Sequence, residues 1–350
     1  MHPVLVYGAS GYSGRLVARE LCRLGVRPLL CGRDGRKVAA VADELGLPHR
    51  VAAVDDPTAL AAAVAEASVV LNAAGPFSHT TAPLVAACLA RGAHYLDIAG
   101  EVPAVAALAA RHAEARARGV MLLPSVGFDV VPTDCLLAYV ARRCPGGRAL
   151  VTAVSKPLFL SPGSAKTLLE HVDLGVARRQ GVVTPLRLGA IERAFDFGDG
   201  ARSCLNVSFV DVVTAYYTTG IGDVTTFVEA TPLLRLLPLG LILAPWIRSP
   251  FGELVGQTLA DAIWRDPPGT ADTGSYRMTV IAECSDGNGR TVRARLTTPE
   301  AYDFTGVTAA AIAARVAAGE VEPGFQTPAR LFGADFVLGF AGVRREDCDS

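Results

Sequence analysis

The stretch Val4-Leu5-Val6-Tyr7-Gly8-Ala9-Ser10-Gly11-Tyr12-Ser13-Gly14 decides the fold of this chain. A short apolar strand runs directly into three glycines spaced three residues apart, and apolar residues then recur at helical spacing over 14–24. Glycines at such a turn let the backbone bend tightly and approach a pyrophosphate, while the NH groups of the following helix face the anion. The stretch therefore predicts the first strand, turn and helix of a dinucleotide-binding fold.

The second predicted strand, over 26–31, ends at Gly32-Arg33-Asp34, which is the position that distinguishes NAD from NADP. A site for NAD usually has a carboxylate here, whereas a site for NADP has a cation. Arg33 is suited to bidentate pairing with a 2′-phosphate, and Lys37 adds a second positive charge one helical turn later. Asp34 has two interpretations, as a ribose ligand or as the cap of the following helix. The position predicts NADP(H) as the cofactor.

Strands and Ala-rich helices alternate from the N-terminus to about Asp129. Strands are expected at 4–7, 26–31, 50–54, 68–73, 94–98 and 120–124, and helices at 14–24, 35–45, 57–66, 79–91 and 102–118. Such an alternation of strands and crossover helices makes a doubly wound parallel sheet, in which ligands bind at the carboxyl ends of the strands. The residues that directly follow each strand are therefore expected to carry the function.

Two of these strand ends add candidate cofactor contacts. Small residues and a Gly-Pro turn follow the fourth strand, and they let the backbone lie against the cofactor's ribose. Asp55, after the third strand, is placed either to accept a hydrogen bond from the adenine amino group or to cap the next helix. The added candidates are Asp55, Ala73, Ala74, Gly75, Pro76 and Phe77.

The pattern changes after Asp129. A helix over 130–143 precedes strands rich in Val, Thr and aromatic residues, and the turn 286–289 indicates a hairpin. These strands are expected at 150–159, 203–217, 275–284 and 290–297, and a further helix at 307–318 is expected on that sheet or at the domain boundary. We predict an α/β protein with a Rossmann NADP-binding domain over 1–129 and a second, α+β substrate domain with a mixed or antiparallel sheet over 130–324. We leave open whether the tail, 325–350, packs back on the first domain.

Composition argues against several classes of protein. The formal net charge is −1 and no basic stripe is present, which argues against nucleic-acid binding. The eight cysteines are dispersed without a CxxC pair, which favours a reducing cytoplasm and no metal site. The chain enters a strand at Pro3, which leaves no room for a signal peptide.

The apolar segment 232–247 is the part of the sequence that most resembles a membrane-spanning helix, but we do not expect it to span a membrane. Arg235, Pro238 and Pro245 interrupt it, and its unbroken part is too short to cross the ~30 Å of bilayer hydrocarbon. Three interpretations stay open: a buried core segment, a wall over an apolar substrate, and an interfacial anchor.

Three residues are candidates for catalysis. Asp129 closes the last Rossmann strand, and Lys166 and His171 lie about one helical turn apart where the second domain begins. Lys166 is suited to anchor a carboxylate, phosphate or thioester oxygen. Each residue also has a structural interpretation, as a helix cap, a solvated lysine or a surface histidine. No tyrosine is followed by the Tyr-x-x-x-Lys pattern of short-chain dehydrogenases, which excludes the commonest other chemistry of such a glycine turn, and Cys135 has no base near it in sequence.

The motifs GASGYSGRLVARELCRLG, CGRDGRKV, LNAAGPF, GAHYLDIAGE, LPSVGFDVVPTD and GFQTPARLFG, in this order, resemble the saccharopine dehydrogenase-like family, especially its bacterial trans-acting enoyl reductase branch. The resemblance implies NADP(H), a substrate domain on a mixed sheet, and reduction of a double bond. It assigns the phosphates to Gly8, Ser10, Gly11, Tyr12, Ser13 and Gly14, the 2′-phosphate to Arg33 and Lys37, and the nicotinamide ribose to Ala74-Gly75-Pro76. The turn at 162–167 departs from the family's Gly-Gly-Thr pattern, so a different substrate pocket is expected.

Three functional hypotheses follow from these observations and from the resemblance. The first is an NADPH-dependent reductase of a C=C bond in a hydrophobic substrate, a small molecule or an acyl chain on a polyketide synthase or acyl carrier. The second is an imine reductase of saccharopine or opine type, for which cations are available at Lys156, Lys166, Arg178, Arg179, Arg187 and Arg193. The third is an NADP(H)-binding protein without turnover. A homodimer is compatible with each of them.

Overall fold

The computed structural model describes residues 2–155, 175–232, 234–236 and 276–348. The chain forms two compact units, each built from two segments of sequence. Unit 1 comprises Met1–Val131 and Tyr302–Leu331, and unit 2 comprises Pro132–Ala301 and Phe332–Ser350. The boundary expected after residue 129 lies close to the observed one. The later boundary differs, because the segment from Tyr302 onward belongs to unit 1 and the C-terminal segment from Phe332 belongs to unit 2.

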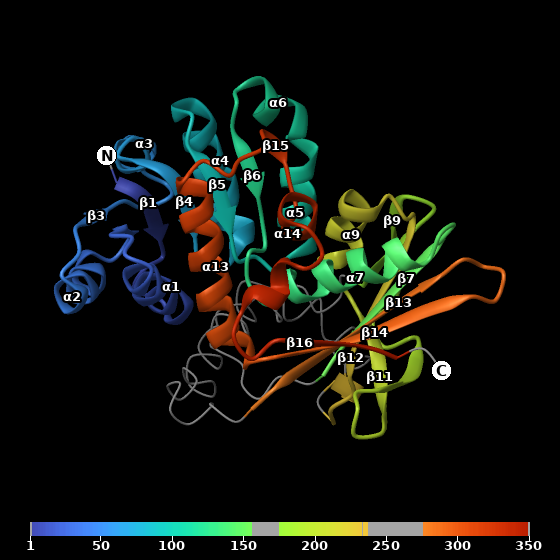
Figure 1. Ribbon diagram of the computed structural model, residues 1–350. Helices are drawn as coiled ribbons and strands as arrows, with labels where there is room; N and C mark the ends of the chain where they lie inside the picture. Colours follow the sequence, from blue (N-terminus) through green and yellow to red (C-terminus); the bar gives the residue numbers. More distant parts are fainter. Residues whose placement is uncertain (1, 156–174, 233, 237–275, 349–350) are drawn as a thin grey trace. The chain divides into compact units, whose positions relative to one another are not determined.

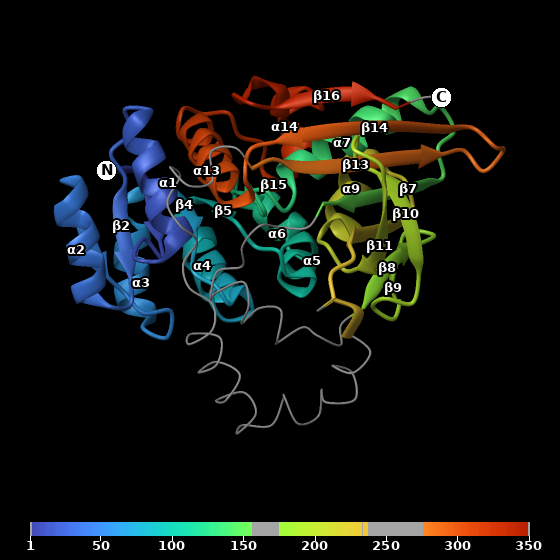
Figure 2. The ribbon, with the colours of Figure 1, turned by 90° about the horizontal axis from the view of Figure 1, so that it is seen from below.

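Unit 1 is built on a parallel sheet of seven strands in the order β15-β6-β5-β4-β1-β2-β3. Its strands are β1 (His2–Tyr7), β2 (Leu29–Gly32), β3 (His49–Val51), β4 (Ala67–Asn72), β5 (His94–Asp97), β6 (Met121–Leu123) and β15 (Gly324–Phe325). Its helices are α1 (Tyr12–Arg23), α2 (Gly35–Leu45), α3 (Pro57–Val64), α4 (Phe77–Arg91), α5 (Val102–Ala110), α6 (His112–Ala117), α13 (Ala301–Ala317) and α14 (Pro328–Phe332). Figure 2 shows α1 and α13 on one face of this sheet and α4 and α5 on the other.

The predicted doubly wound sheet is confirmed in unit 1. All strands expected before residue 129 are present, and the expected helix over 102–118 divides into α5 and α6 around Arg111. β1 lies in the middle of the sheet, where Val4, Leu5 and Val6 are fully buried, because helices cover both faces. The strand order reverses between β1 and β4, which is the point where such sheets bind their ligands.

The seventh strand and its helix come from the segment Tyr302–Leu331. α13 packs on α1 so closely that a Cβ at Gly306 would lie 3.0 Å from the Cβ of Leu16. β15 adds to the free edge of β6, and the ring Nδ1 of His112 accepts a hydrogen bond from the Phe325 NH at 3.1 Å. The helix expected at 307–318 therefore packs on the Rossmann unit.

Gln326, directly after β15, is fully buried, and neither polar atom of its side-chain amide has a hydrogen-bond partner among the described residues. Such a group keeps its desolvation cost without a compensating bond. We expect Gln326→Met, which has a similar length and no polar head, to raise the free energy of unfolding by about 1–2 kcal/mol in urea titrations. Gln326→Glu should change it in the opposite direction. A less stable methionine variant would show that the amide does have a stabilising partner.

The described part of unit 2 is built on a mixed sheet of nine strands. The main order is β10-β11-β12-β7-β13-β14-β16, with β12 and β7 parallel and the other pairs antiparallel, and β8 joins β12 to β9. Its strands are β7 (Ala149–Val154), β8 (Val176–Arg179), β9 (Val182–Pro185), β10 (Glu192–Asp196), β11 (Ala201–Val207), β12 (Asp223–Glu229), β13 (Met278–Ser285), β14 (Thr291–Thr298) and β16 (Arg344–Asp347). Its helices are α7 (Val131–Arg143), α9 (Asp211–Thr219), η1 (Leu234–Leu236) and η2 (Phe336–Gly339). The predicted second domain with a mixed sheet is confirmed, and Figure 1 shows α7 and α9 beside it.

One predicted strand of unit 2 is wrong. The strand expected over 203–217 ends at Val207, and α9 follows, so Tyr216 lies on a helix. Val, Thr and Tyr favour strands only weakly and mainly through packing, and here five consecutive residues of α9, from Asp211 to Ala215, are buried. Gly220, with φ +77°, ends the helix in the left-handed conformation. The hairpin expected at 286–289 is confirmed between β13 and β14.

The apolar segment 232–247 lies largely outside the described residues, so its three interpretations stay open. Among the helices that are described, none is both long and apolar enough to cross a membrane.

Candidate functional site

The turn between β1 and α1 depends on glycine at two positions for reasons of space. Gly8 has φ +81°, and a Cβ there would lie 2.7 Å from the Cβ of Ala74 on the neighbouring strand end. A Cβ at Gly14 would lie 2.3 Å from the Gly8 carbonyl oxygen. Gly11 is different, because a Cβ there would meet only that same oxygen, at 3.3 Å. Packing explains Gly8 and Gly14, whereas Gly11 leaves the surface of the turn bare for a ligand.

The N-terminus of α1 is open to an anion. Gly11 is its N-cap and offers no side chain, and the first turn holds no acidic residue. The hydroxyls of Ser10 and Ser13, both partly exposed, flank this helix end. The ring of Tyr12 lies edge-on against Tyr302, with the ring centroids 5.4 Å apart. The contact with the phosphates that we expect of Tyr12 would therefore be made by its backbone NH and not by its ring. The free NH groups and the helix dipole together attract phosphate oxygens.

The end of β2 has the features that a 2′-phosphate requires. The carboxylate of Asp34 caps α2 by accepting hydrogen bonds from the NH groups of Arg36 and Lys37, both at 3.1 Å. Of the two interpretations of Asp34, the structure therefore shows the cap. The Lys37 ammonium lies 3.9 Å from this carboxylate in an exposed, weak ion pair. Arg33 is exposed, and within the described part of the chain its guanidinium makes no hydrogen bond or ion pair.

Asp55 is not the helix cap that its position before Pro57 suggested. Asp56 is the N-cap of α3, and its carboxylate accepts hydrogen bonds from the NH groups of Thr58 and Ala59. Asp55 itself is exposed. Its interpretation as an adenine contact stays a prediction. Nearby, the Tyr7 hydroxyl donates to the Ala52 carbonyl, and burial raises the pKa of Tyr7 to about 12.

The turn after β4 is held by the side chain of Asn72. Its Oδ1 accepts from the Ala74 NH at 3.0 Å, and its Nδ2 donates to the hydroxyls of Thr80 and Tyr95. Gly75 is exposed, and a Cβ there would touch nothing closer than the Phe77 ring at 3.7 Å. Packing therefore gives no reason for glycine at this position, which supports its role as bare backbone beside a ribose.

The remaining candidate cofactor contacts at this turn have structural roles, either in the backbone of the turn or in the hydrophobic core. Ala73 continues the sheet pairing through an NH that donates to the Tyr7 carbonyl at 2.8 Å, and Pro76 is the N-cap of α4. The Phe77 side chain is buried. A contact of Phe77 with a cofactor is therefore limited to its backbone.

The ends of β5 and β6 are joined by a buried network. Asp97 Oδ1 accepts from the NH groups of Ala99 and Ser125, and the Ser125 hydroxyl donates to the Ala99 carbonyl at 2.6 Å. Burial raises the pKa of Asp97 to about 6. Ser125 has φ +57°, a strained backbone conformation for a serine that the network holds in place. Ser125 is the residue that sequence reasoning missed, because no sequence pattern marks a left-handed serine.

Asp129 lies against this network. A Cβ at Gly100 would lie 2.8 Å from Asp129 Oδ2, so the carboxylate sits directly over that glycine. Loss of hydration raises the pKa of Asp129 to about 6, but the residue is exposed, so solvent screening makes the effect of this shift on stability small. Lys166 and His171 lie outside the described residues.

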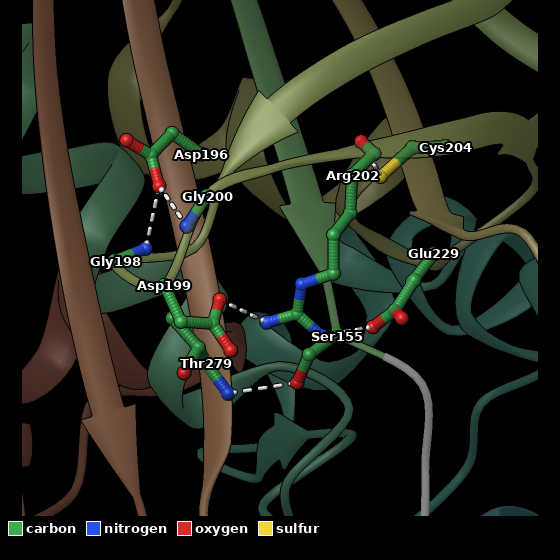
Figure 3. A network of polar contacts seen from close by, with 9 residues as sticks. All are labelled: Ser155, Asp196, Gly198, Asp199, Gly200, Arg202, Cys204, Glu229 and Thr279. Atoms are coloured by element: carbon green, nitrogen blue, oxygen red, sulfur yellow. Dashed lines mark hydrogen bonds and ion pairs between the residues drawn. The ribbon is translucent and has the colours of Figure 1, made fainter.

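A network of polar contacts crosses one face of the unit 2 sheet (Figure 3). The Arg202 guanidinium lies between two carboxylates, 2.7 Å from Glu229 and 3.0 Å from Asp199, and stacks 4.7 Å from the centre of the Phe197 ring. Ser155, at the end of β7, accepts a hydrogen bond from the Thr279 NH at 2.9 Å. Phe197 belongs to a hydrophobic cluster that also contains Ala153, Phe195, Cys204, Phe227 and Ile281.

Several cations that the sequence offered for substrate carboxylates are used inside unit 2. Arg178 is buried, donates to the Val212 carbonyl, and lies 4.4 Å over the Tyr216 ring. Arg193 pairs with Glu283 at 2.6 Å. Lys156 and Lys166 lie outside the described residues. Burial also raises the pKa of the Cys135 thiol well above its usual range, which removes it as a nucleophile.

Comparison with known proteins agrees with this geometry. Residues 4–123 match the family described as the saccharopine dehydrogenase NADP binding domain. A Mycobacterium tuberculosis protein provisionally named a trans-acting enoyl reductase is 37% identical over 195 residues, which cover 51% of this chain and 46% of that protein. A trans-acting enoyl reductase of Mycobacterium ulcerans is 32% identical over 148 residues, or 40% of this chain and 35% of the relative. The chain thus matches less than half the length of these relatives.

A solved structure shares the whole fold. Apo saccharopine dehydrogenase (L-Glu forming) from Saccharomyces cerevisiae superimposes with a TM-score of 0.66 at 12% identity, covering 99% of both chains. At this identity the likeness concerns the fold alone. The matched segment 4–123 contains the glycine turn, Arg33 and the small-residue turn after β4. Over residues 4–123 this chain is therefore similar to the NADP-binding domain of saccharopine dehydrogenases.

Proposed function

We propose that the protein is an NADPH-dependent oxidoreductase that reduces the C=C bond of a hydrophobic enoyl group on an acyl carrier or polyketide synthase. The observation that carries the cofactor part is the end of β2, where Asp34 is engaged as a cap and Arg33 stands exposed without a partner among the described residues. The names of the mycobacterial relatives support the enoyl substrate and the carrier.

The residues of unit 1 fit a bound dinucleotide. The open end of α1 would hold the pyrophosphate, Arg33 and Lys37 the 2′-phosphate, and the bare backbone at Gly75 the ribose. When bound, NADPH supplies the hydride. The protein's own contribution is to hold the acceptor carbon in place and to provide a proton.

Asp129 is our candidate for the proton donor, because its carboxylate lies at the end of the last Rossmann strand with its pKa raised to about 6. We expect Asp129→Asn to lower kcat by about 10²–10⁴-fold and to remove the fall in kcat above pH 6, where the wild-type carboxyl loses its proton. The measurement is a pH–rate profile between pH 5 and pH 9. An unchanged profile would mean that water or another group supplies the proton.

Asp129→Asn should also change how the free energy of unfolding depends on pH, and this can be measured without substrate. A carboxyl group whose pKa is higher in the folded protein binds its proton more tightly there, so its contribution to stability declines as the pH rises from about 4 to 6. Asp129→Asn removes this decline. In urea titrations the free energy of unfolding of the wild type minus that of the variant should therefore be larger at pH 4 than at pH 7.

The imine reductase of saccharopine or opine type is the second candidate function. It needs cations for two or more substrate carboxylates, but Arg178 and Arg193 are engaged within unit 2. Arg187 is exposed and stays available. The engagement of Arg178 and Arg193 favours the enoyl substrate.

Two assays test the proposal. Fluorescence titration should give a much lower Kd for NADPH than for NADH, and equal values would overturn the cofactor assignment. NADPH consumption on addition of an enoyl thioester of a carrier protein would support C=C reduction, whereas consumption only with an amine and a keto acid would support imine reduction. Binding of NADPH without oxidation across enones, imines and carbonyls would indicate a non-catalytic NADP(H)-binding protein.

A further inference from the structure

The side chain of Glu101 caps a helix other than its own. Glu101 is the N-cap residue of α5, yet its carboxylate makes no capping hydrogen bond there. Instead Oε1 accepts from the Phe77 NH and Oε2 from the Ser78 NH, each at 2.8 Å, and both NH groups belong to the first turn of α4. Only 3% of Glu101 is exposed. A buried carboxylate therefore fills the N-terminus of a helix 24 positions earlier in the chain.

This contact matters because of where α4 begins. Phe77 directly follows the Ala74-Gly75-Pro76 turn, and Ala74 in turn lies against Gly8 of the phosphate-binding turn. Two helix N-termini thus begin beside neighbouring strands, α1 after β1 and α4 after β4. Each would attract an anion through its free NH groups and its dipole. In α1 this end is open, and in α4 a carboxylate of the protein occupies it.

We propose that Glu101 is a positioning residue of the cofactor site. Acting through the backbone of Phe77 and Ser78, it fixes the turn that faces the ribose, and it closes the end of α4 to phosphate, so that the cofactor's pyrophosphate binds at α1. The proposal rests on the proposed NADP(H) site for its effect on the cofactor. The occupation of α4 by the carboxylate is independent of any cofactor.

The first test uses a small carboxylate to replace the missing side chain. In Glu101→Ala the two NH groups of α4 lose their acceptor, and the buried space admits an anion. We expect acetate or formate, at tens of millimolar, to raise the Tm of this variant by several degrees more than the Tm of the wild type. Inorganic phosphate should act similarly on the variant.

The second test measures NADPH affinity by fluorescence titration. We expect Glu101→Ala to weaken NADPH binding about tenfold, which corresponds to roughly 1.4 kcal/mol and is typical of a lost helix cap. Acetate should restore most of this affinity. Glu101→Gln keeps one acceptor oxygen and should give an intermediate Kd, because its amide nitrogen cannot accept from the second NH.

Asp56→Ala is the matched control. Asp56 also caps a helix through two NH groups, at 3.0 and 3.1 Å, but it caps α3 rather than the helix that follows the ribose turn. This variant should lose a similar amount of stability and keep the wild-type Kd for NADPH. If NADPH binding were equally weakened in Asp56→Ala and Glu101→Ala, Glu101 would be a structural helix cap without a specific effect on the cofactor site.

The outcomes separate this inference from the proposed function. If the wild type does not bind NADPH, the cofactor assignment fails, while anion-dependent stabilisation of Glu101→Ala still decides whether the carboxylate fills the end of α4. If the wild type binds NADPH but Glu101→Ala binds it equally well and ignores acetate, the role of Glu101 is overturned.

Discussion

Gly14→Ala is expected to lower the free energy of unfolding by about 3 kcal/mol, because the new methyl group would lie 2.3 Å from the Gly8 carbonyl oxygen and 2.9 Å from the Ala9 Cα. Both neighbours are backbone atoms, which cannot rotate away as the end of a flexible side chain would. The glycine turn or α1 must therefore shift. Urea denaturation at constant pH measures the loss, and NADPH affinity should fall with it because α1 no longer faces the phosphates correctly.

Gly11→Ala is the matched substitution three residues earlier. Its methyl group meets only the Gly8 oxygen, at 3.3 Å, and the residue has φ −74°, which alanine adopts readily. We expect it to fold with stability within about 1 kcal/mol of the wild type but to bind NADPH at least tenfold more weakly, because the methyl group covers the surface that approaches the pyrophosphate. Loss of stability in both variants, with equal loss of affinity, would show that packing alone requires all three glycines.

Arg33→Ala is expected to raise the Kd for NADPH by roughly 10–100-fold and to leave the Kd for NADH nearly unchanged. A charge-assisted hydrogen bond is worth about 1.5–3 kcal/mol, and Arg33 is exposed without a competing carboxylate in the described structure. Paired fluorescence titrations of both cofactors measure the change. The preference for NADPH should also weaken as salt is raised, because the arginine is exposed.

Arg116→Ala is the control for this substitution. Arg116 lies exposed in the last turn of α6, so its replacement makes the same change in net charge away from the end of β2. We expect no change in the affinity for either cofactor. A similar loss in this variant would mean that Arg33 acts through the overall field of the protein and does not contact the 2′-phosphate.

The parallel sheet was predictable because its signals are local and repeated. β2, β4 and β5 are apolar runs that end in glycine, asparagine or aspartate, and helices of unit 1 begin at recognisable caps such as Asp34 and Asp56. The candidate cofactor site was proposed for the same reason, since its residues lie directly after those strands. The sequence left two local roles open at Asp34 and at Asp55, and the structure shows that Asp34 caps α2 and that Asp56, not Asp55, caps α3.

The rest depended on contacts between distant parts of the chain. α9 has the composition of a strand and becomes a helix through burial of its first half, which no local pattern reports. The contact of Glu101 with α4 and the left-handed conformation of Ser125 arise from the loops that β4, β5 and β6 bring together. β15 is only two residues long, too short for any periodicity to mark it as a strand.

The return of Tyr302–Leu331 to unit 1 has a consequence for the time course of folding. β15 follows β6 by about 200 residues, so the outer edge of β6 has no partner until these residues have been synthesised. At usual translation rates of about 5–20 residues per second, this interval lasts roughly 10–40 s. During it an unpaired strand edge is exposed to pairing with other chains. The Rossmann unit is therefore completed on the ribosome only after the whole segment between β6 and β15 has been made.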